Sequence, residues 1–160
     1  TTESFAMPHS LSHYRILTAA LGALALFAGP LRAEVIDIDN AELARLAASG
    51  IPVVDIRTPG EWKSTGVIAG SRLLTFFDEN GSADTARWLA SAKGFAAPGQ
   101  PVILICRSGG RTRAATQFLA QKAGYTTVYN VKQGMNGWLA EQRPVVPSEK
   151  AIACKPGTPC

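Results

Sequence analysis

The chain has 160 residues, which is enough for one domain of ordinary size and too few for two. With 46% hydrophobic and 18% charged residues, its composition is that of a folded globular protein and excludes disordered, collagen-like and coiled-coil classes. The formal net charge of +4 is spread along the chain without a basic run, so we expect no nucleic-acid partner.

The first segment along the chain is apolar. Arg15 precedes an uncharged stretch over residues 16–31, and Ala33 supplies a small residue shortly after it. A basic flank, a short apolar core and a small residue are typical of a secretory signal. The stretch is shorter than the roughly 20 residues that cross a bilayer. We predict that residues 1–33 are a signal segment cleaved after Ala33.

This interpretation fixes an expected location. The natural start is then Met7, with residues 1–6 non-native, and the mature protein is periplasmic or secreted. An N-terminal membrane anchor is the alternative.

From residue 34 onward, short apolar runs alternate with helix-like segments. In chain order we predict a strand at 35–38, a helix at 41–48 capped by Asn40, a strand at 52–56, a short helix around 61–62, a strand at 72–76, a helix at 83–93, a strand at 101–105, a helix at 112–123, a strand at 126–129 and a last helix containing Met135, Trp138 and Leu139. Such alternation predicts right-handed crossovers and a parallel sheet with helices on both faces. The predicted fold class is α/β.

The clearest candidate site follows the most apolar strand. Residues 101–105 read as a central strand buried on both faces, and Cys106 comes directly after it. In parallel sheets the reactive crevice lies beyond the carboxyl ends of the strands, where unpaired N–H groups and the helix dipole favour anions. Gly109 and Gly110 allow close approach, and Arg107 and Arg111 add positive charge, so we predict a stabilised Cys106 thiolate. An isolated cysteine is more often a small buried hydrophobe, but these neighbours favour a reactive thiol.

The chain contains three cysteines, so at most two can pair within it. Cys154 and Cys160 lie in a Pro- and Gly-rich tail, and as a hypothesis we expect a disulfide between them in an oxidising compartment. The alternatives are pairing with other molecules and a resolving role that collects sulfur from Cys106.

The segment from Cys106 to Thr112 resembles the active-site loop of single-domain bacterial rhodaneses. Three further segments, in the same order as in that family, resemble its other marks: residues 53–57, 61–71 and 131–138. Val67 and Ala69 depart from it where relatives often have His and Pro, and Gln133 replaces the first of two closing glycines. The resemblance covers about residues 34–147, leaving residues 148–160 as a Cys- and Pro-rich tail.

The resemblance implies a rhodanese-like five-stranded parallel sheet and a sulfurtransferase that carries sulfane sulfur as a Cys106 persulfide. The donor would be thiosulfate or a similar small anion, and the acceptor cyanide, a thiol or a sulfur-accepting protein. No metal or cofactor is expected, and we expect a monomer. The residues implied in substrate binding are Arg107, Ser108, Gly109, Gly110, Arg111 and Thr112.

The residues also bear on rival mechanisms. Both histidines, His9 and His13, precede the apolar segment, which excludes Cys–His acyl transfer in a mature protein. A thiol phosphatase of the same fold remains an alternative. In the phosphatase loop that residues 106–112 resemble, the arginine lies six positions after the cysteine, whereas Arg111 lies five positions after Cys106. A non-catalytic sulfur carrier or redox domain is the other alternative. We expect structural roles for Asp55, Arg57 and Glu61 and core positions for the tryptophans Trp62, Trp88 and Trp138.

Overall fold

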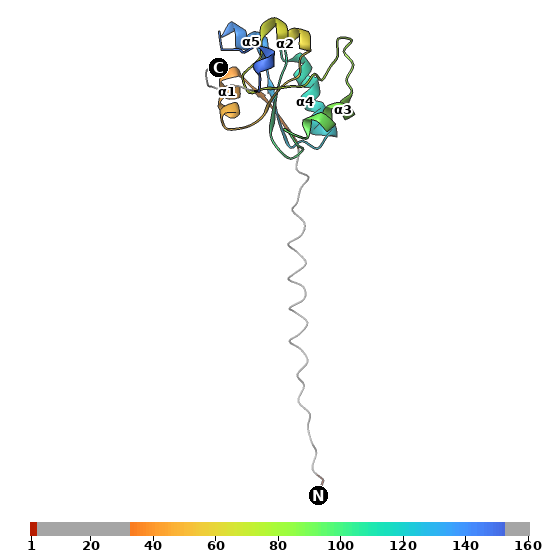
Figure 1. The fold of residues 1–160 in the computed structure, drawn as a ribbon. Coiled ribbons are helices and arrows are strands. Elements are labelled where there is room, and N and C mark those ends of the chain that lie inside the picture. Colours follow the sequence, from red (N-terminus) through yellow and green to blue (C-terminus); the bar gives the residue numbers. More distant parts are fainter. Residues whose placement is uncertain (3–32, 153–160) are drawn as a thin grey trace. The chain divides into compact units, whose positions relative to one another are not determined.

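The computed structural model describes residues 1–2 and 33–152. The predicted signal stretch at 16–31 and the tail residues Cys154 and Cys160 lie outside the described residues. One of the two compact units of the chain, residues 32–160, holds all the described elements. These are, in chain order (Figure 1), β1 (Glu34–Ile38), α1 (Asn40–Ala48), β2 (Val53–Asp55), α2 (Pro59–Thr65), β3 (Arg72–Leu73), α3 (Thr85–Ala92), β4 (Val102–Ile105), α4 (Gly110–Lys122), β5 (Thr127–Val131), α5 (Gly134–Ala140) and the 3-10 turn η1 (Ser148–Lys150).

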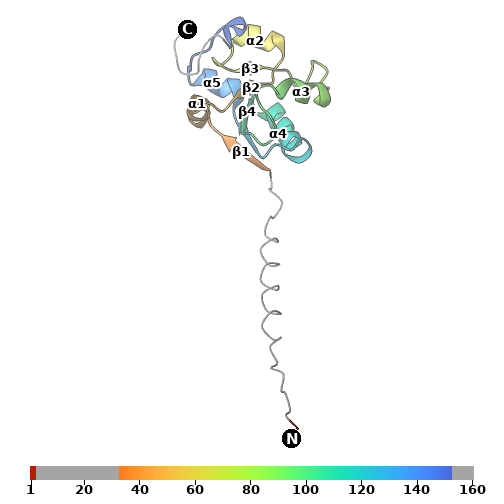
Figure 2. The same ribbon diagram turned by 60° about the horizontal axis from the view of Figure 1, so that its bottom comes forward.

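The strands form one five-stranded sheet in the order β1-β5-β4-β2-β3, and every neighbouring pair is parallel. This confirms the predicted α/β class and the five-stranded parallel sheet. β4 lies in the middle of the sheet, bonded to β5 on one side and to β2 on the other. Figure 2 shows β2 and β3 on one side of β4 and the edge strand β1 on the other.

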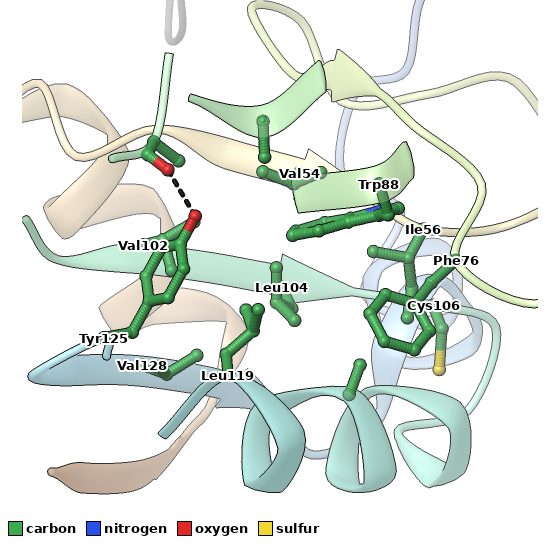
Figure 3. Packing of buried hydrophobic residues seen from close by; sticks show 13 residues of the cluster. Val54, Ile56, Phe76, Trp88, Val102, Leu104, Cys106, Leu119, Tyr125 and Val128 are labelled. Atoms are coloured by element: carbon green, nitrogen blue, oxygen red, sulfur yellow. Dashed lines mark hydrogen bonds between the residues drawn. The ribbon is translucent and has the colours of Figure 1, made fainter. Parts of the chain in front are cut away.

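Side chains of β4 alternate between two separate cores. Val102 and Leu104 pack in one core beneath α3 and α4, and Ile103 and Ile105 pack in the other beneath α1 and α5. Figure 1 shows the two helix pairs on opposite sides of the sheet. Figure 3 shows the side chains of the first core in detail. The continuous apolar run of β4 is therefore buried on both faces, as predicted.

Helices α1 and α4 begin at other residues than predicted. Asp39, not Asn40, caps α1, and its carboxylate accepts the N–H of Glu42 at 2.9 Å. Asn40 lies inside the helix, where its buried amide donates to Glu141 at 2.7 Å. Helix α4 begins two residues earlier than predicted, at Gly110.

The predicted strand at 72–76 is also shorter in the structure. Only Arg72 and Leu73 pair with β2. The chain then leaves the sheet edge, although the backbone N–H of Leu74 still donates to Asp55 and the ring of Phe76 is buried in the core.

After α5 the chain returns to the loop that follows α2. Val67 and Val146 exchange two backbone hydrogen bonds of 2.9 Å each, and the N–H of Gly70 donates to the carbonyl of Ala151. Ala151 is buried, so packing extends into the first residues of the predicted tail. Within residues 33–152, no helix is both long and apolar enough to cross a membrane.

Candidate active site

Cys106 lies at the end of β4, where the chain turns into α4. The turn depends on Gly109, which has φ of 90° and precedes the first helical residue. A Cβ atom at this position would overlap the carbonyl oxygen of Lys132. Glycine alone therefore fits here, for both conformational and steric reasons.

The start of α5 holds the segment 106–112, which we call the cysteine loop, from the other side. The N–H of Met135 donates to the carbonyl of Cys106 at 2.8 Å, and the N–H of Asn136 donates to Arg107 at 2.9 Å. Gly134, with φ of 55°, brings the two segments together, because a Cβ atom there would overlap the Cys106 carbonyl. The segment at 131–138, which resembles the family's closing mark, therefore positions the cysteine loop directly.

The Cys106 side chain is 1% exposed and lies beside Phe76 at the edge of the core (Figure 3). Its Sγ accepts the N–H of Gly109 at 3.2 Å and lies 3.6 Å from the Thr112 hydroxyl. Burial alone raises the pKa of the thiol, but the Thr112 hydroxyl and the N–H groups of Thr112, Ser108 and Gly109 outweigh it, and the net pKa of Cys106 is lowered. The predicted stabilisation of the thiolate is thus supported by the geometry of the loop.

Arg111 also reaches this site, but its charge is compensated. Its guanidinium donates to both carboxylate oxygens of Glu61, at 2.8 and 2.5 Å. This pairing holds the pKa of Glu61 at about 2 and raises the pKa of Arg111. Arg111 is therefore held in place by α2 and does not present a free guanidinium.

Three further residues of the cysteine loop are exposed and line an open cavity. Arg107, Ser108 and Gly110 are exposed, whereas Gly109 and Thr112 are buried under the loop. The cavity has a volume of about 790 Å³, and we call it the active-site mouth. It is lined by Thr58, Glu61, Phe77, Asp78, Glu79, Gly81, Arg107, Ser108, Gly110, Arg111 and Ala114.

Asp78 and Glu79 are among the lining residues of the mouth that were absent from the predicted site. Asp78 and Glu79 carried only a turn signal in the sequence, and they follow β3 on a separate element from the cysteine loop. No local pattern links a turn to a loop that lies far along the chain, so only the fold brings them together.

The residues expected to be structural mostly are. Asp55 and Arg57 form a buried ion pair with an N–O distance of 2.6 Å, each side chain 1% exposed. Trp88 and Trp138 are buried in the two cores. Trp62 instead lines a second cavity of about 650 Å³, so the expectation of a core position was wrong for this residue.

Comparisons with known proteins agree with this geometry. Residues 39–141 match the profile of the family described as the rhodanese-like domain. The chain is 28% identical over 123 residues to rhodanese-like domain-containing protein 17 of Arabidopsis thaliana, covering 74% of this chain and 78% of the relative. It is 27% identical over 120 residues to thiosulfate sulfurtransferase 18 of the same plant, covering 73% and 88% respectively.

A solved structure confirms the fold. The crystal structure of Rv0390 from M. tuberculosis superimposes with a TM-score of 0.59 at 24% identity, covering 72% of this chain and 99% of that one. At this identity the likeness establishes the fold alone.

Proposed function

Because the chain belongs to the rhodanese-like domain family, we propose that it is a sulfurtransferase that carries sulfane sulfur on Cys106. The donor is thiosulfate or a similar compound, and the acceptor is a thiophile. One observation carries this proposal: the Sγ of Cys106 lies inside a turn of N–H donors that lowers its pKa. This environment favours both a thiolate nucleophile and a persulfide anion. Named sulfurtransferases among the relatives support the same class of reaction.

The proposed reaction has two steps. In the first, the Cys106 thiolate attacks the outer sulfur of thiosulfate, a new S–S bond forms, and the old bond breaks with its electron pair leaving on sulfite. In the second, an acceptor attacks the outer persulfide sulfur, and the electron pair of the broken bond returns to Sγ. Sulfite leaves as a stable anion, so neither step needs a general acid.

The geometry favours this reaction over phosphate ester hydrolysis. Bound phosphate is usually held by an arginine through a bidentate pair of hydrogen bonds. In Arg111 both terminal guanidinium nitrogens already donate to Glu61. Glu61 itself is ionised near neutral pH, because its pKa is about 2, and it has no proton to give a leaving group. We therefore expect negligible hydrolysis of aryl phosphates.

The test is the intact mass of the protein after incubation with thiosulfate and removal of the excess. We expect the wild type to gain one sulfur atom and Cys106→Ser to gain none, because an alcohol neither supplies the nucleophile at this pH nor holds a persulfide. Cyanide should then remove the sulfur and release thiocyanate. A wild-type protein that gains no sulfur and hydrolyses aryl phosphates would be a phosphatase instead.

The same assay compares how much Arg111 and Arg107 each contribute to the rate of sulfur loading. Arg111→Ala should slow loading by about tenfold or more, because it removes a cation near Sγ and leaves the Glu61 carboxylate unpaired beside an anionic donor. Arg107→Ala should slow it less, since that side chain is exposed. Circular dichroism of both variants should match the wild type.

A further inference from the structure

The charges that line the active-site mouth are of both signs. Two cations, Arg107 and Arg111, and three carboxylates, Glu61, Asp78 and Glu79, lie on its walls. The Glu61–Arg111 ion pair is neutral as a unit. What remains is one cation against two carboxylates.

These uncompensated charges come from different elements. Arg107 belongs to the cysteine loop, whose N–H groups surround Sγ. Asp78 and Glu79 belong to the turn after β3, and neither forms an ion pair with any residue of 33–152. The mouth therefore has a positive side at Arg107 of the cysteine loop and a negative side at this turn.

The turn holds its negative side in a defined position. The Asp78 carboxylate accepts the N–H groups of Asn80 and Ser82 at 2.9 and 2.8 Å, and the N–H of Asp78 donates back to the Ser82 carbonyl at 2.8 Å. Glu79 makes no side-chain hydrogen bond with the described residues, so its carboxylate is available to a ligand. Glu79 can consequently be changed without removing a bond that holds the turn.

We propose that the sulfur acceptor is an aminothiol, a small molecule with a thiolate at one end and an ammonium group at the other. The thiolate would face the loop with Arg107 and the N–H groups, and the ammonium group would face Asp78 and Glu79. This inference rests on the proposed function, because it names the acceptor of the same persulfide.

The transfer step balances without any further reactant. The aminothiol sulfur attacks the outer sulfur of the Cys106 persulfide and forms a new S–S bond. The bond from Sγ to that outer sulfur breaks, its electron pair stays on Sγ, and any proton on the outer sulfur leaves with it. The products are the Cys106 thiolate and an aminothiol persulfide.

The test uses the full chain loaded with sulfur from thiosulfate and freed of excess donor. Cysteamine, 2-mercaptoethanol and 3-mercaptopropionate are added separately, and loss of the sulfur is followed by intact mass. The variants are wild type, Glu79→Gln and Glu34→Gln. The last is a matched control, because Glu34 begins β1 at the opposite end of the sheet from the strand ends that carry Cys106. Each thiol is compared with itself across variants, so differences in thiol pKa cancel.

Glu79→Gln should lower the rate ratio of cysteamine to 3-mercaptopropionate by about two- to fourfold, the size expected for one exposed charge a few ångströms away. Added salt should lower the same ratio in the wild type and change it less in Glu79→Gln. An unchanged ratio in Glu79→Gln, or an equal fall in Glu34→Gln, would overturn the aminothiol proposal while leaving the sulfurtransferase intact. A protein that accepts no sulfur in the loading step would refute the proposed function, and this inference with it.

Discussion

Glu61 connects the helix α2 to the cysteine loop through a single ion pair. Its carboxylate is also part of a capping box, in which it accepts the N–H of Thr58 at 3.1 Å. The Arg111 guanidinium is the main cause of its low pKa, and the bond from Thr58 adds to it. The carboxylate thus stabilises the start of α2 and fixes an active-site arginine together.

This coupling predicts a pH dependence of stability. The folded-state pKa of Glu61, about 2, lies below its ordinary value of 4.5, so ionised Glu61 stabilises the fold fully above about pH 4.5. That contribution is lost as the pH falls towards 2. Glu61→Gln should therefore be less stable than the wild type by about 1–3 kcal/mol at pH 7, with the gap closing between pH 4.5 and 2.

Urea unfolding at a series of pH values measures this gap. Glu34→Gln serves as the control, since Glu34 lies outside every ion pair of residues 33–152 and should give no such closing gap. A Glu61→Gln gap that stays constant from pH 7 to pH 3 would show that the ion pair does not stabilise the fold.

Among single residues, the sequence singles out the candidate nucleophile Cys106 but not the residues that position the groups around it. Cys106 was predicted because a thiol after an apolar strand, beside two glycines and two arginines, is a local pattern. The Glu61–Arg111 pair joins residues 50 positions apart, and no spacing rule selects one carboxylate among many. The interpretation of Arg111 as a free positive charge was incomplete for that reason.

Among the elements, α5 contacts the cysteine loop directly, although it carries no predicted site residue. Its first N–H groups donate to the carbonyls of Cys106 and Arg107. Helix starts have unpaired N–H groups, and here the cysteine loop supplies their acceptors. The loop is consequently fixed on one side by its own glycines and on the other by α5.

Gly134→Ala tests this role of α5. The substitution forces an alanine to a φ of 55° and places its Cβ against the Cys106 carbonyl, so we expect a loss of about 2–4 kcal/mol in the free energy of unfolding. Sulfur loading of Cys106 should also slow, because the loop must shift. Gly94→Ala is the matched control: its Cβ meets nothing within 4 Å, and its stability should stay within about 0.5 kcal/mol of the wild type.

Differential scanning calorimetry and the loading assay give the two readouts. A Gly134→Ala protein with wild-type stability and loading would mean that the backbone of the loop relaxes around the new methyl group. The α5 contact would then be incidental to the site.

Over the whole molecule, the sequence predicts the class of fold but not the order of its strands. Alternating apolar runs and helical segments predict a parallel sheet, because crossovers of this kind do not build antiparallel pairs. The position of β4 between β2 and β5 depends on packing across the entire sheet. The turn at Asp78 and Glu79 was not assigned to the site for the same reason, because its position beside the cysteine loop also depends on the packing of the whole fold.

The fold also continues past the family match, which ends at residue 141. The carbonyl of Pro144 accepts the indole N–H of Trp138 at 2.9 Å, and Val146 pairs with the fully buried Val67. Ala151 then buries its side chain and accepts the N–H of Gly70. This returning segment, residues 143–151, covers the loop that follows α2.

Two truncations measure how much the returning segment contributes. Deleting residues 143–160 removes the four hydrogen bonds that link this segment to Val67, Gly70 and Trp138, and the two that Arg143 donates to Trp138 and Glu141. It also exposes the apolar surface around Val67, so we expect the free energy of unfolding to fall by about 2–4 kcal/mol. Deleting residues 153–160 keeps all of these contacts and should leave stability within about 0.5 kcal/mol of the full chain. Urea unfolding of the three proteins gives the comparison. Equal stability of both truncations would mean that the returning segment only lies on the surface, and that the domain is complete where the family match ends.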